Sequence, residues 1–545
     1  MPAVYHALLT RRYLTTKLIP SLSVLAVMLC SAMVLIVWSI MGGFLEKLLG
    51  SGEDLMGDVA ITWPIKGFAH YEDLIGRLEA HDEIAAAAPE IQVFGLLELP
   101  DGRLPGVYIR GIDPQRHARV VGYFDSLYWK PMDTPLPRDG SGLDPRLSRA
   151  NDDPDAPVNR DARFIDPAFW ERVYEDGRTL SELKDSATGE RTPAIVLGIE
   201  LADYSQRTAA GYYETIVTRF GMGFAERLSD GSTRPAGSVF MPDNSVRLTL
   251  LPVSDDAVPF DVVQRAFPVA NEFQTKVHDV NSGQVLLPLD ELQRLLRMDE
   301  AERIDEETFD PVGGFGEQDG SETFGDPDII GIEPARVTTV LVRGAEGVTS
   351  ERVQEICKQV YAEFHEAHLF DTPPTRAMER NIVTWKQRNG AFVAAVQKEI
   401  GLVLFLLLFI SMTAVFLILA IFWAMVSEKT RDIGILRAIG ATGFGVAWIW
   451  LRYGLAIGVV GAVLGMIVAH VIVWNINPIH EWLGRALGLT IWDPSIYVLV
   501  EIPNDVNPTH ALVVFVGAII ASAVGALVPA IKAARLDPVT ALRFE

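Results

Sequence analysis

A short segment between two long apolar stretches holds the residues whose types and spacing are most informative. Ser427–Gly443 reads SEKTRDIGILRAIGATG and mixes charged side chains with branched apolar ones. A water-facing connector does not need such apolar side chains, so we expect a short helix that buries an apolar edge in a protein partner and ends at Gly440. A basic connector between two membrane spans is the simpler interpretation. The residues assigned to this docking segment are Glu428, Lys429, Arg431, Asp432, Ile433, Gly434, Leu436, Arg437 and Gly440.

The chemistry of an enzyme is missing from the rest of the sequence. No lysine follows a glycine, so there is no phosphate-binding G-x-x-x-x-G-K-[ST] loop, and no G-x-S-x-G nucleophile motif occurs. His365 and His368 are three positions apart, one short of the i, i+4 spacing of a zinc-binding helix. Two cysteines are too few for a cysteine-built zinc site. We therefore expect a non-enzymatic chain that hydrolyses no ATP itself and holds no metal or cofactor.

The elements that position the docking segment are predicted membrane spans. A bilayer crossing takes about 20 apolar residues, and the first apolar run is too long to be that of a signal peptide. The predicted fold class is a membrane protein with four transmembrane α-helices and a large α+β extracytoplasmic domain inserted between helices 1 and 2. The four predicted spans are Leu18–Gly42, Ile400–Val426, Phe444–Trp474 and Ala511–Ile531.

Lysine and arginine predict the orientation of these spans. They gather in 1–17, 427–443 and 532–545. The segment 475–510 contains a single arginine, Arg485, and no lysine. Because basic loops stay in the cytoplasm, we expect both termini and the docking segment to lie there. Residues 43–399 and 475–510 then face outward.

The net charge of the chain and the local composition of the segment 43–399 narrow its possible functions and predict its structure. The chain has 47 Lys and Arg against 70 Asp and Glu, a net charge of −23, which argues against nucleic-acid binding. Acidic, glycine-rich stretches near 130–161 and 299–327 are expected to be loops or insertions. Alternating patterns predict strands at Asp58–Thr62, Pro105–Gly111, Ser245–Leu251, Gly283–Leu287 and Arg336–Arg343, and helices at Tyr71–Ala80, Leu289–Arg297 and Ser350–Leu369, the last with Ser350 as its N-cap.

Small residues recur at helical spacing in the third and fourth predicted spans. Such residues let two helices approach closely. Packing within one chain and packing between two copies both fit this pattern. The glycines assigned to helix packing are Gly454, Gly458, Gly461, Gly465, Gly517 and Gly525.

Four stretches resemble one family of transport proteins. They are the first-span exit Val34–Leu48, the GIDP segment within Val107–Val121, the junction Thr384–Thr442 and the tail Leu527–Glu545. With one span, a large outer domain and then three spans, the chain resembles the FtsX-like permease family with a MacB-like periplasmic core domain. Within that family it is most similar to the lipoprotein-releasing permeases of the LolC/LolE type. The resemblance places the MacB-like domain at 43–399 and the FtsX-like permease region at 400–545.

The resemblance implies a mechanotransmission-type ABC transporter of the bacterial inner membrane. Two permease subunits, identical or paralogous, would pair with a cytoplasmic LolD-like ATPase, and the docking segment would be the coupling helix. Lipoprotein would be lifted from the membrane and handed to a periplasmic carrier. A MacB-like efflux subunit and an FtsX-like transmembrane regulator of periplasmic enzymes are the alternatives within the family. A membrane-anchored sensor is the alternative outside it, and it would need a long cytoplasmic domain.

Extraction of an acylated protein also needs an apolar surface near the membrane, because each CH₂ group taken from the bilayer costs about 0.8 kcal/mol. Aromatic and apolar residues near the outer ends of the first two spans are candidates for contact with lipid or substrate. Interfacial anchoring of the helices explains the same residues more simply. The candidates are Trp38, Met41, Phe44, Leu48, Trp385 and Phe392.

Overall fold

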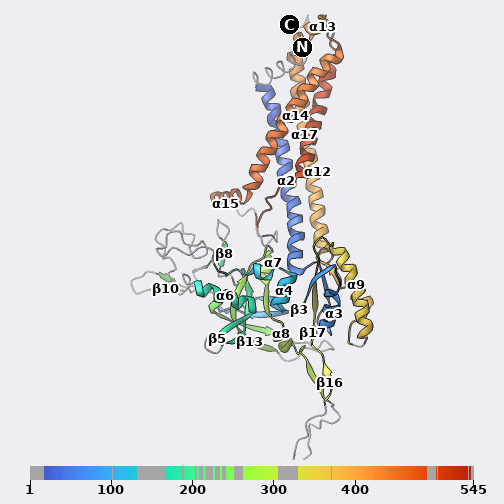
Figure 1. Ribbon diagram of the computed structural model, residues 1–545. Coiled ribbons are helices and arrows are strands. Elements are labelled where there is room, and N and C mark those ends of the chain that lie inside the picture. Colours follow the sequence, from blue (N-terminus) through green and yellow to red (C-terminus); the bar gives the residue numbers. More distant parts are fainter. Residues whose placement is uncertain are drawn as a thin grey trace, which may run out of the picture. The chain divides into compact units, whose positions relative to one another are not determined.

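A computed structural model of the chain divides into two compact units, which are described separately below (Figure 1). The first unit comprises Met1–Leu48, Gly390–Asp493 and Glu501–Glu545, and the second comprises Leu49–Asn389 and Pro494–Val500. The structure describes residues 18–100, 102–131, 167–185, 189–202, 205–207, 213–215, 225–227, 233–235, 241–250, 262–304, 329–369, 371–487, 492, 499, 501–537, 539 and 541.

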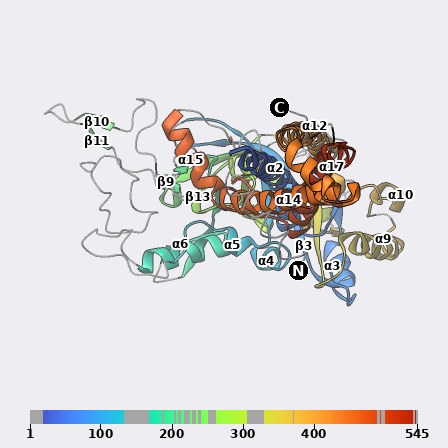
Figure 2. The ribbon, with the colours of Figure 1, turned by 90° about the horizontal axis from the view of Figure 1, so that it is seen from above.

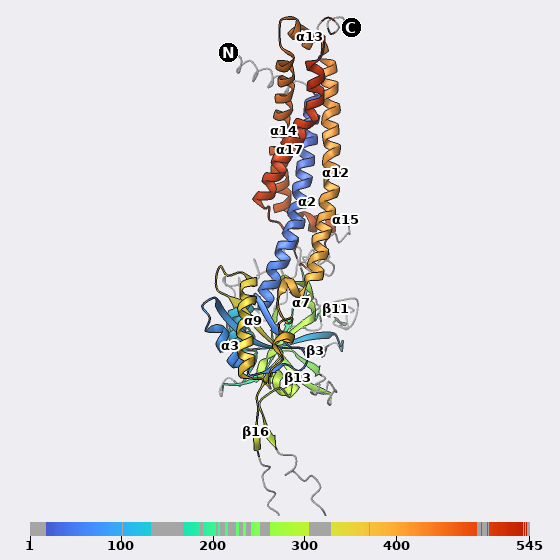
Figure 3. The same ribbon diagram turned by 90° about the vertical axis from the view of Figure 1, so that its right-hand side faces the viewer.

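Several predicted features lie outside these described residues. They are the basic segment 1–17, nearly all of the first expected insertion and most of the second. The described start of the second insertion forms a strand, β15 (Ala301–Ile304), which pairs in a two-stranded ladder with β16 (Ile329–Glu333), just after the predicted insertion. Figure 3 shows this ladder extending away from the sheet.

Four helices in the described part of the chain are long and apolar enough to cross a membrane, as predicted. Two of them extend well beyond their apolar runs. The first reaches Met56, because Leu48, Ser51, Gly52 and Met56 continue a buried stripe at helical spacing. The helices that contribute to the first unit are α2 (Leu18–Met56), α12 (Gly390–Glu428), α13 (Thr430–Ala438), α14 (Gly443–Trp474), α15 (Ile476–Leu487) and α17 (Pro508–Ala534).

Several buried clusters join these helices in the described part of the chain, and two of them include residues of α2. One joins Val27 of α2 to Ile418 and Phe422 of α12 and to Ile457 of α14, and the other joins Leu35 of α2 to α14 and α17. Seen along the bundle, α14 and α17 lie side by side with α12 next to them (Figure 2). Much of the remaining surface of α12 is apolar and exposed, which is the pattern of a helix that meets lipid or another membrane helix.

A nine-stranded mixed sheet forms the centre of the second unit. Its order is β12-β13-β7-β14-β4-β3-β18-β1-β19, and a further pairing of β12 with β3 joins its first strand back to the longest one. The sheet strands are β1 (Val59–Thr62), β3 (Ile84–Glu98), β4 (Gly106–Ile112), β7 (Ile195–Gly198), β12 (Ser245–Leu250), β13 (Val263–Phe273), β14 (Gln284–Pro288), β18 (Thr339–Gly344) and β19 (Ile382–Thr384).

Shorter elements surround this sheet. The helices are α3 (Tyr71–Glu79), α4 (Pro114–Val120), α5 (Tyr123–Ser126), α6 (Pro167–Thr179), α7 (His278–Gly283), α8 (Leu289–Leu296), α9 (Ser350–Ala367), α10 (Thr375–Met378), α11 (Trp385–Arg388) and the 3₁₀ turn η2 (Met241–Asp243). The remaining strands are β2 (Phe68–Ala69), β5 (Ser181–Asp185), β6 (Glu190–Pro193), β8 (Ser205–Arg207), β9 (Tyr213–Thr215), β10 (Ala225–Arg227), β11 (Thr233–Pro235) and β17 (Arg336–Val337).

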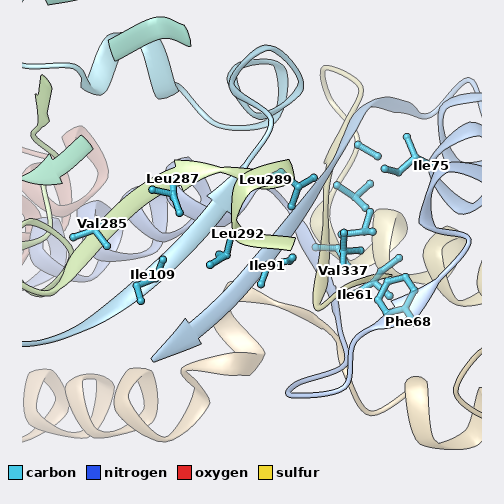
Figure 4. Close-up of a cluster of buried hydrophobic side chains, with 14 of the residues drawn as sticks. Ile61, Phe68, Ile75, Ile91, Ile109, Val285, Leu287, Leu289, Leu292 and Val337 are labelled. Atoms are coloured by element: carbon cyan, nitrogen blue, oxygen red, sulfur yellow. The ribbon is translucent and has the colours of Figure 1, made fainter. Parts of the chain in front are cut away.

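The sheet is buried on both faces because its strands alternate between two apolar clusters. In β18, Val340 and Val342 belong to one cluster and Leu341 to the other. The first cluster includes side chains of α9 and, as Figure 4 shows, of α3 and α8. The second includes α4, α7 and the end of α2 at Met56. The end of α2 therefore packs onto one particular face of the sheet.

Several predicted elements occur close to their expected positions, but two expectations were wrong in detail. The predicted strand Arg336–Arg343 is two strands separated at Thr338. β17 pairs with β2, whereas β18 belongs to the large sheet. The N-cap of α9 is Thr349, whose hydroxyl accepts the backbone N–H of Arg352 at 3.4 Å. Ser350 instead donates to Asp58 Oδ1 at 3.1 Å.

A buried carboxyl predicts a pH dependence of stability. Burial raises the pKa of Glu272 to about 8, although Trp129 Nε1 donates a hydrogen bond to its Oε2 at 2.7 Å. The folded state binds a proton more tightly than the unfolded one, so stability should be highest below about pH 4.5 and fall until about pH 8. Glu272→Gln should remove this slope, on the order of 4 kcal/mol. Thermal unfolding of the native chain and of Glu272→Gln between pH 4.5 and 8 measures this difference. An equal pH dependence of stability in the two proteins would contradict the prediction.

Candidate functional site

Helix α13 lies between the long helices α12 and α14 and contains most of the predicted docking segment. Lys429 Nζ bonds Asp432 Oδ2 at 2.7 Å across its first turn. The helix closes with a Schellman motif, in which Gly440 N–H donates to the Arg437 carbonyl at 3.1 Å and Ala441 N–H to the Leu436 carbonyl at 3.0 Å. Gly440 has φ +104°, a conformation that favours glycine. A short, sharply ended helix is therefore held between two membrane helices.

One face of α13 is attached to the membrane helices. Ile433 is 3% exposed and packs in a cluster with Val426 of α12, Val446 of α14 and Ala533 of α17. At the start of α14, a Cβ on Gly443 would lie 2.9 Å from the carbonyl oxygen of Ala534, so the backbones approach closely there. Thr442 caps α14 by accepting the N–H of Gly445 at 3.1 Å. The buried face of α13 therefore contacts three long helices.

The other face of α13 carries an exposed apolar edge. Ile435 is 42% exposed, Leu436 45% and Ile439 80%. We call these three residues the α13 edge. The surrounding charged residues are Glu428, Arg431, Asp432 and Arg437; Arg437 Nη1 donates to the Ala441 carbonyl at 3.3 Å. An exposed apolar edge bordered by charges is the arrangement by which a helix docks into a groove of another protein.

Not every residue of the predicted docking segment faces outward. Ile433 and Gly434 are buried within the chain. The sequence pattern predicted that Ile433 faces a partner. In the structure, its side chain instead packs against the long helices α12, α14 and α17. Ile439 is the most exposed apolar residue of the edge and was not among the residues assigned to the site.

Five of the six glycines assigned to helix packing lie at close contacts within this chain. A Cβ added at each would come within 3 Å of another helix: Gly454 of Ala526, Gly458 of Ser522, Gly461 of Val27, Gly465 of Ser31 and Gly525 of Ile418. A Cβ at Gly517 would meet no described atom within 4 Å. Four of these glycines serve the packing of α14 against α2 and α17, and Gly525 serves the packing of α17 against α12, while the space around Gly517 is open.

The candidate contact residues differ in accessibility. Phe44 is 8% exposed with its ring edge-on to Trp492 at 6.1 Å, Leu48 is 2% exposed, and Trp38 stacks on His510 at 4.3 Å. Met41 is half-buried. In the second unit, Trp385 packs on the end of α2. Phe392, at 41%, is the most exposed of the six.

A buried charged group in the second unit escaped the sequence interpretation. Arg110 makes a bidentate ion pair with the fully buried Glu90, with both nitrogen–oxygen distances 2.7 Å. Burial raises the pKa of Glu90, but the charge and hydrogen bonds of Arg110 more than offset this and hold it below its usual value. Burial, with Arg110 nearby, lowers the pKa of His117 to about 3. A charged residue in an otherwise apolar strand, as in VYIRG, is the signal that predicts such a pair.

The comparison with known families bears on the part of the chain that carries α13. Residues 404–538 match the FtsX-like permease C-terminal family. This part of the chain is therefore similar to FtsX-like permease domains. The matched region contains α13, α14, α15 and α17 completely and most of α12.

Several curated relatives of the chain are transmembrane proteins of lipoprotein-releasing systems. The lipoprotein-releasing system transmembrane protein LolC of Xylella fastidiosa (strain 9a5c) is 26% identical over 213 residues, which is 37% of this chain and 52% of the relative. LolC of Neisseria meningitidis serogroup B is 27% identical over 161 residues, 30% and 39% of the two chains. LolE of Haemophilus influenzae is 27% identical over 117 residues, 22% and 28%. The chain matches about half the length of the first of these relatives.

Proposed function

We propose that this chain is the permease subunit of a mechanotransmission-type ABC transporter that releases lipoproteins from the inner membrane toward a periplasmic carrier. A separate cytoplasmic ATPase supplies the energy by docking on the α13 edge. The observation that carries the proposal is the α13 edge itself, exposed on a helix whose other face is packed against α12, α14 and α17. The FtsX-like domain and the LolC and LolE relatives support the same assignment.

The proposal divides the work between the two units. The FtsX-like domain receives the movement of the ATPase, and the α+β unit between α2 and α12 handles the lipoprotein on the outer side of the membrane. A second permease subunit, identical or paralogous, completes the transporter. The open surface around Gly517 and the exposed apolar face of α12 are available to it.

Affinity purification from membranes tests the proposal directly. The full-length chain is extracted in mild detergent and the co-purifying proteins are identified. A cytoplasmic ATPase together with a triacylated lipoprotein is the expected result. An ATPase accompanied by an outer-membrane efflux channel would favour the efflux alternative. A periplasmic cell-wall hydrolase without lipoprotein would favour the regulator alternative.

The purified chain should show no ATP hydrolysis above background, because no phosphate-binding loop is present in its sequence. Hydrolysis should begin when the co-purified ATPase is added back, and release of radiolabelled lipoprotein from proteoliposomes should accompany it. Steady hydrolysis by the chain alone, undiminished after further purification, would contradict the assignment.

A further inference from the structure

The last two turns of α2, Leu49–Met56, belong to the α+β unit and are held there by contacts from three arginine side chains. The last carbonyl groups of a helix have no partner within the helix. Here, arginine side chains of the sheet donate to the carbonyls of Glu53 and Leu55, the first of which also accepts the N–H of Gly57, and a side chain of the adjacent helix α11 contacts Met56. We call Leu49–Met56 with these partners the α2 socket.

Arg343 on β18 makes the most extensive of these contacts. Its Nη2 donates to the backbone carbonyl of Glu53 at 3.0 Å, and its Nε donates to the carbonyl of Val120 at the end of α4 at 2.8 Å. Its Nη1 also lies 3.8 Å from Asp58 Oδ2. One guanidinium therefore joins the end of α2 to a sheet strand and to a helix on the same face. A positive charge at a helix C-terminus also interacts favourably with the helix dipole.

Two further arginines contact the final turn. Arg110 Nη2 donates to the carbonyl of Leu55 at 3.4 Å while the same side chain is fixed by Glu90. Arg388 of α11 contacts Met56 Sδ at 3.6 Å through Nη1 and Gln92 Oε1 at 3.2 Å through Nη2. The final turn is thus linked to β4, β3 and α11.

Close packing completes the socket. A Cβ added at Gly52 would lie 2.1 Å from the ring of Trp385, so the indole lies directly against the helix backbone. Gly57, with φ +72°, ends the helix, and a Cβ there would lie 2.7 Å from the Val342 carbonyl oxygen. Neither position has room for a side chain. The helix end can therefore neither roll nor slide without displacing Trp385 or the sheet.

We infer that Arg343, Arg110 and Trp385 are positioning residues that lock the last two turns of α2 to the sheet, so that this segment and the sheet move as one rigid body. With a flexible hinge at this point, α2 could tilt without moving the sheet. With a rigid connection, the sheet must rotate together with the end of α2. The use of the socket for transmission rests on the proposed function; its rigidity does not.

Distance measurements between spin labels test the socket in the full-length chain. One label is placed by Gly50→Cys, an exposed position with free space, and the other by Glu363→Cys on the exposed face of α9. The native cysteines are removed by Cys30→Ser and Cys357→Ala. A single narrow distance distribution is expected. Arg343→Ala should broaden it, and Gly52→Ala should shift its mean.

Matched controls separate loosening of the socket from loss of folding. Arg247→Ala removes an exposed arginine of β12 that pairs with Glu98 of β3, and Gly76→Ala fills a helix glycine with free space around it. Neither should change the distribution. A second label pair, Asp290→Cys with Glu363→Cys, lies wholly away from α2 and should stay narrow in Arg343→Ala.

Three results would overturn the inference: a broad distribution before any substitution, an unchanged one in both Arg343→Ala and Gly52→Ala, or equal broadening at the second label pair. The measurement needs neither ATPase nor lipoprotein. A result against the rigidity of the α2 socket therefore does not contradict the proposed function. Failure to recover an ATPase or a lipoprotein likewise does not contradict the rigidity of the α2 socket.

Discussion

A chain carrying Leu436→Asp and Ile439→Asp is expected to insert into the membrane normally and to lose its ATPase on co-purification. Both side chains are exposed in the structure, so their replacement leaves the helix bundle intact. Covering an apolar side chain of this size stabilises a complex by about 1.5 kcal/mol or more. The loss of two should weaken docking at least about a hundredfold, and buried carboxylates would weaken it further. Quantitative pull-down against increasing ATPase concentration measures the effect.

Two control variants separate loss of docking from nonspecific effects of an added charge and from loss of folding. Ile332→Asp changes an equally exposed isoleucine in the α+β unit and should leave ATPase binding unchanged. Ile433→Asp should instead reduce the amount of folded protein, since Ile433 is packed between α12, α14 and α17. Retained ATPase binding by the Leu436→Asp, Ile439→Asp chain would rule out the α13 edge as the docking surface.

Arg110→Ala should be among the most destabilising single substitutions in the α+β unit. It leaves Glu90 fully buried without its ion-pair partner, and breaking a buried pair from one side costs about 3–5 kcal/mol. Replacing both members by apolar residues, Glu90→Leu with Arg110→Met, should recover much of the loss, because no charge is then left without a partner.

Cys357 offers a readout of this effect in the full-length chain. Its side chain is completely buried, and burial raises the pKa of its thiol to about 12, so a maleimide should label it when the unit opens. With Cys30→Ser as background, the labelling rate should rise roughly 10²- to 10⁴-fold in Arg110→Ala. It should return most of the way in the double variant. An unchanged rate in Arg110→Ala would show that the pair contributes little.

The sequence predicts those features that depend on local patterns. Apolar runs are enough to predict the four long apolar helices of the described residues, and Gly440 was expected to end a helix, as it does in α13. Runs such as Ser245–Leu250 alternate in burial and are found as strands. The direction in which a side chain faces on a short helix was not predictable: Ile433 and Leu436 look alike in the sequence, and the packing of α12, α14 and α17 makes one buried and the other exposed.

Features that depend on distant partners were missed. The longest strand, β3, reads IAAAAPEIQVFGLLE, whose alanines and proline do not suggest a strand. It forms because β4, β18 and β12 pair with it. The α2 socket likewise depends on residues more than 50 positions away from α2, since Arg343 and Trp385 meet it only in the folded unit. Tertiary contacts of this kind leave no local pattern in one sequence.

The proposed mechanism requires that the α13 edge and the α+β unit lie on opposite sides of the membrane, because one span, α12, separates them in the chain. A membrane-impermeant maleimide, applied to intact spheroplasts that carry a single cysteine in a Cys30→Ser, Cys357→Ala background, tests this most directly. A cysteine in place of Ile332 should be labelled at once, and one in place of Ile439 only after the membrane is permeabilised. Labelling of both positions in intact spheroplasts, or of neither, would contradict the proposed mechanism.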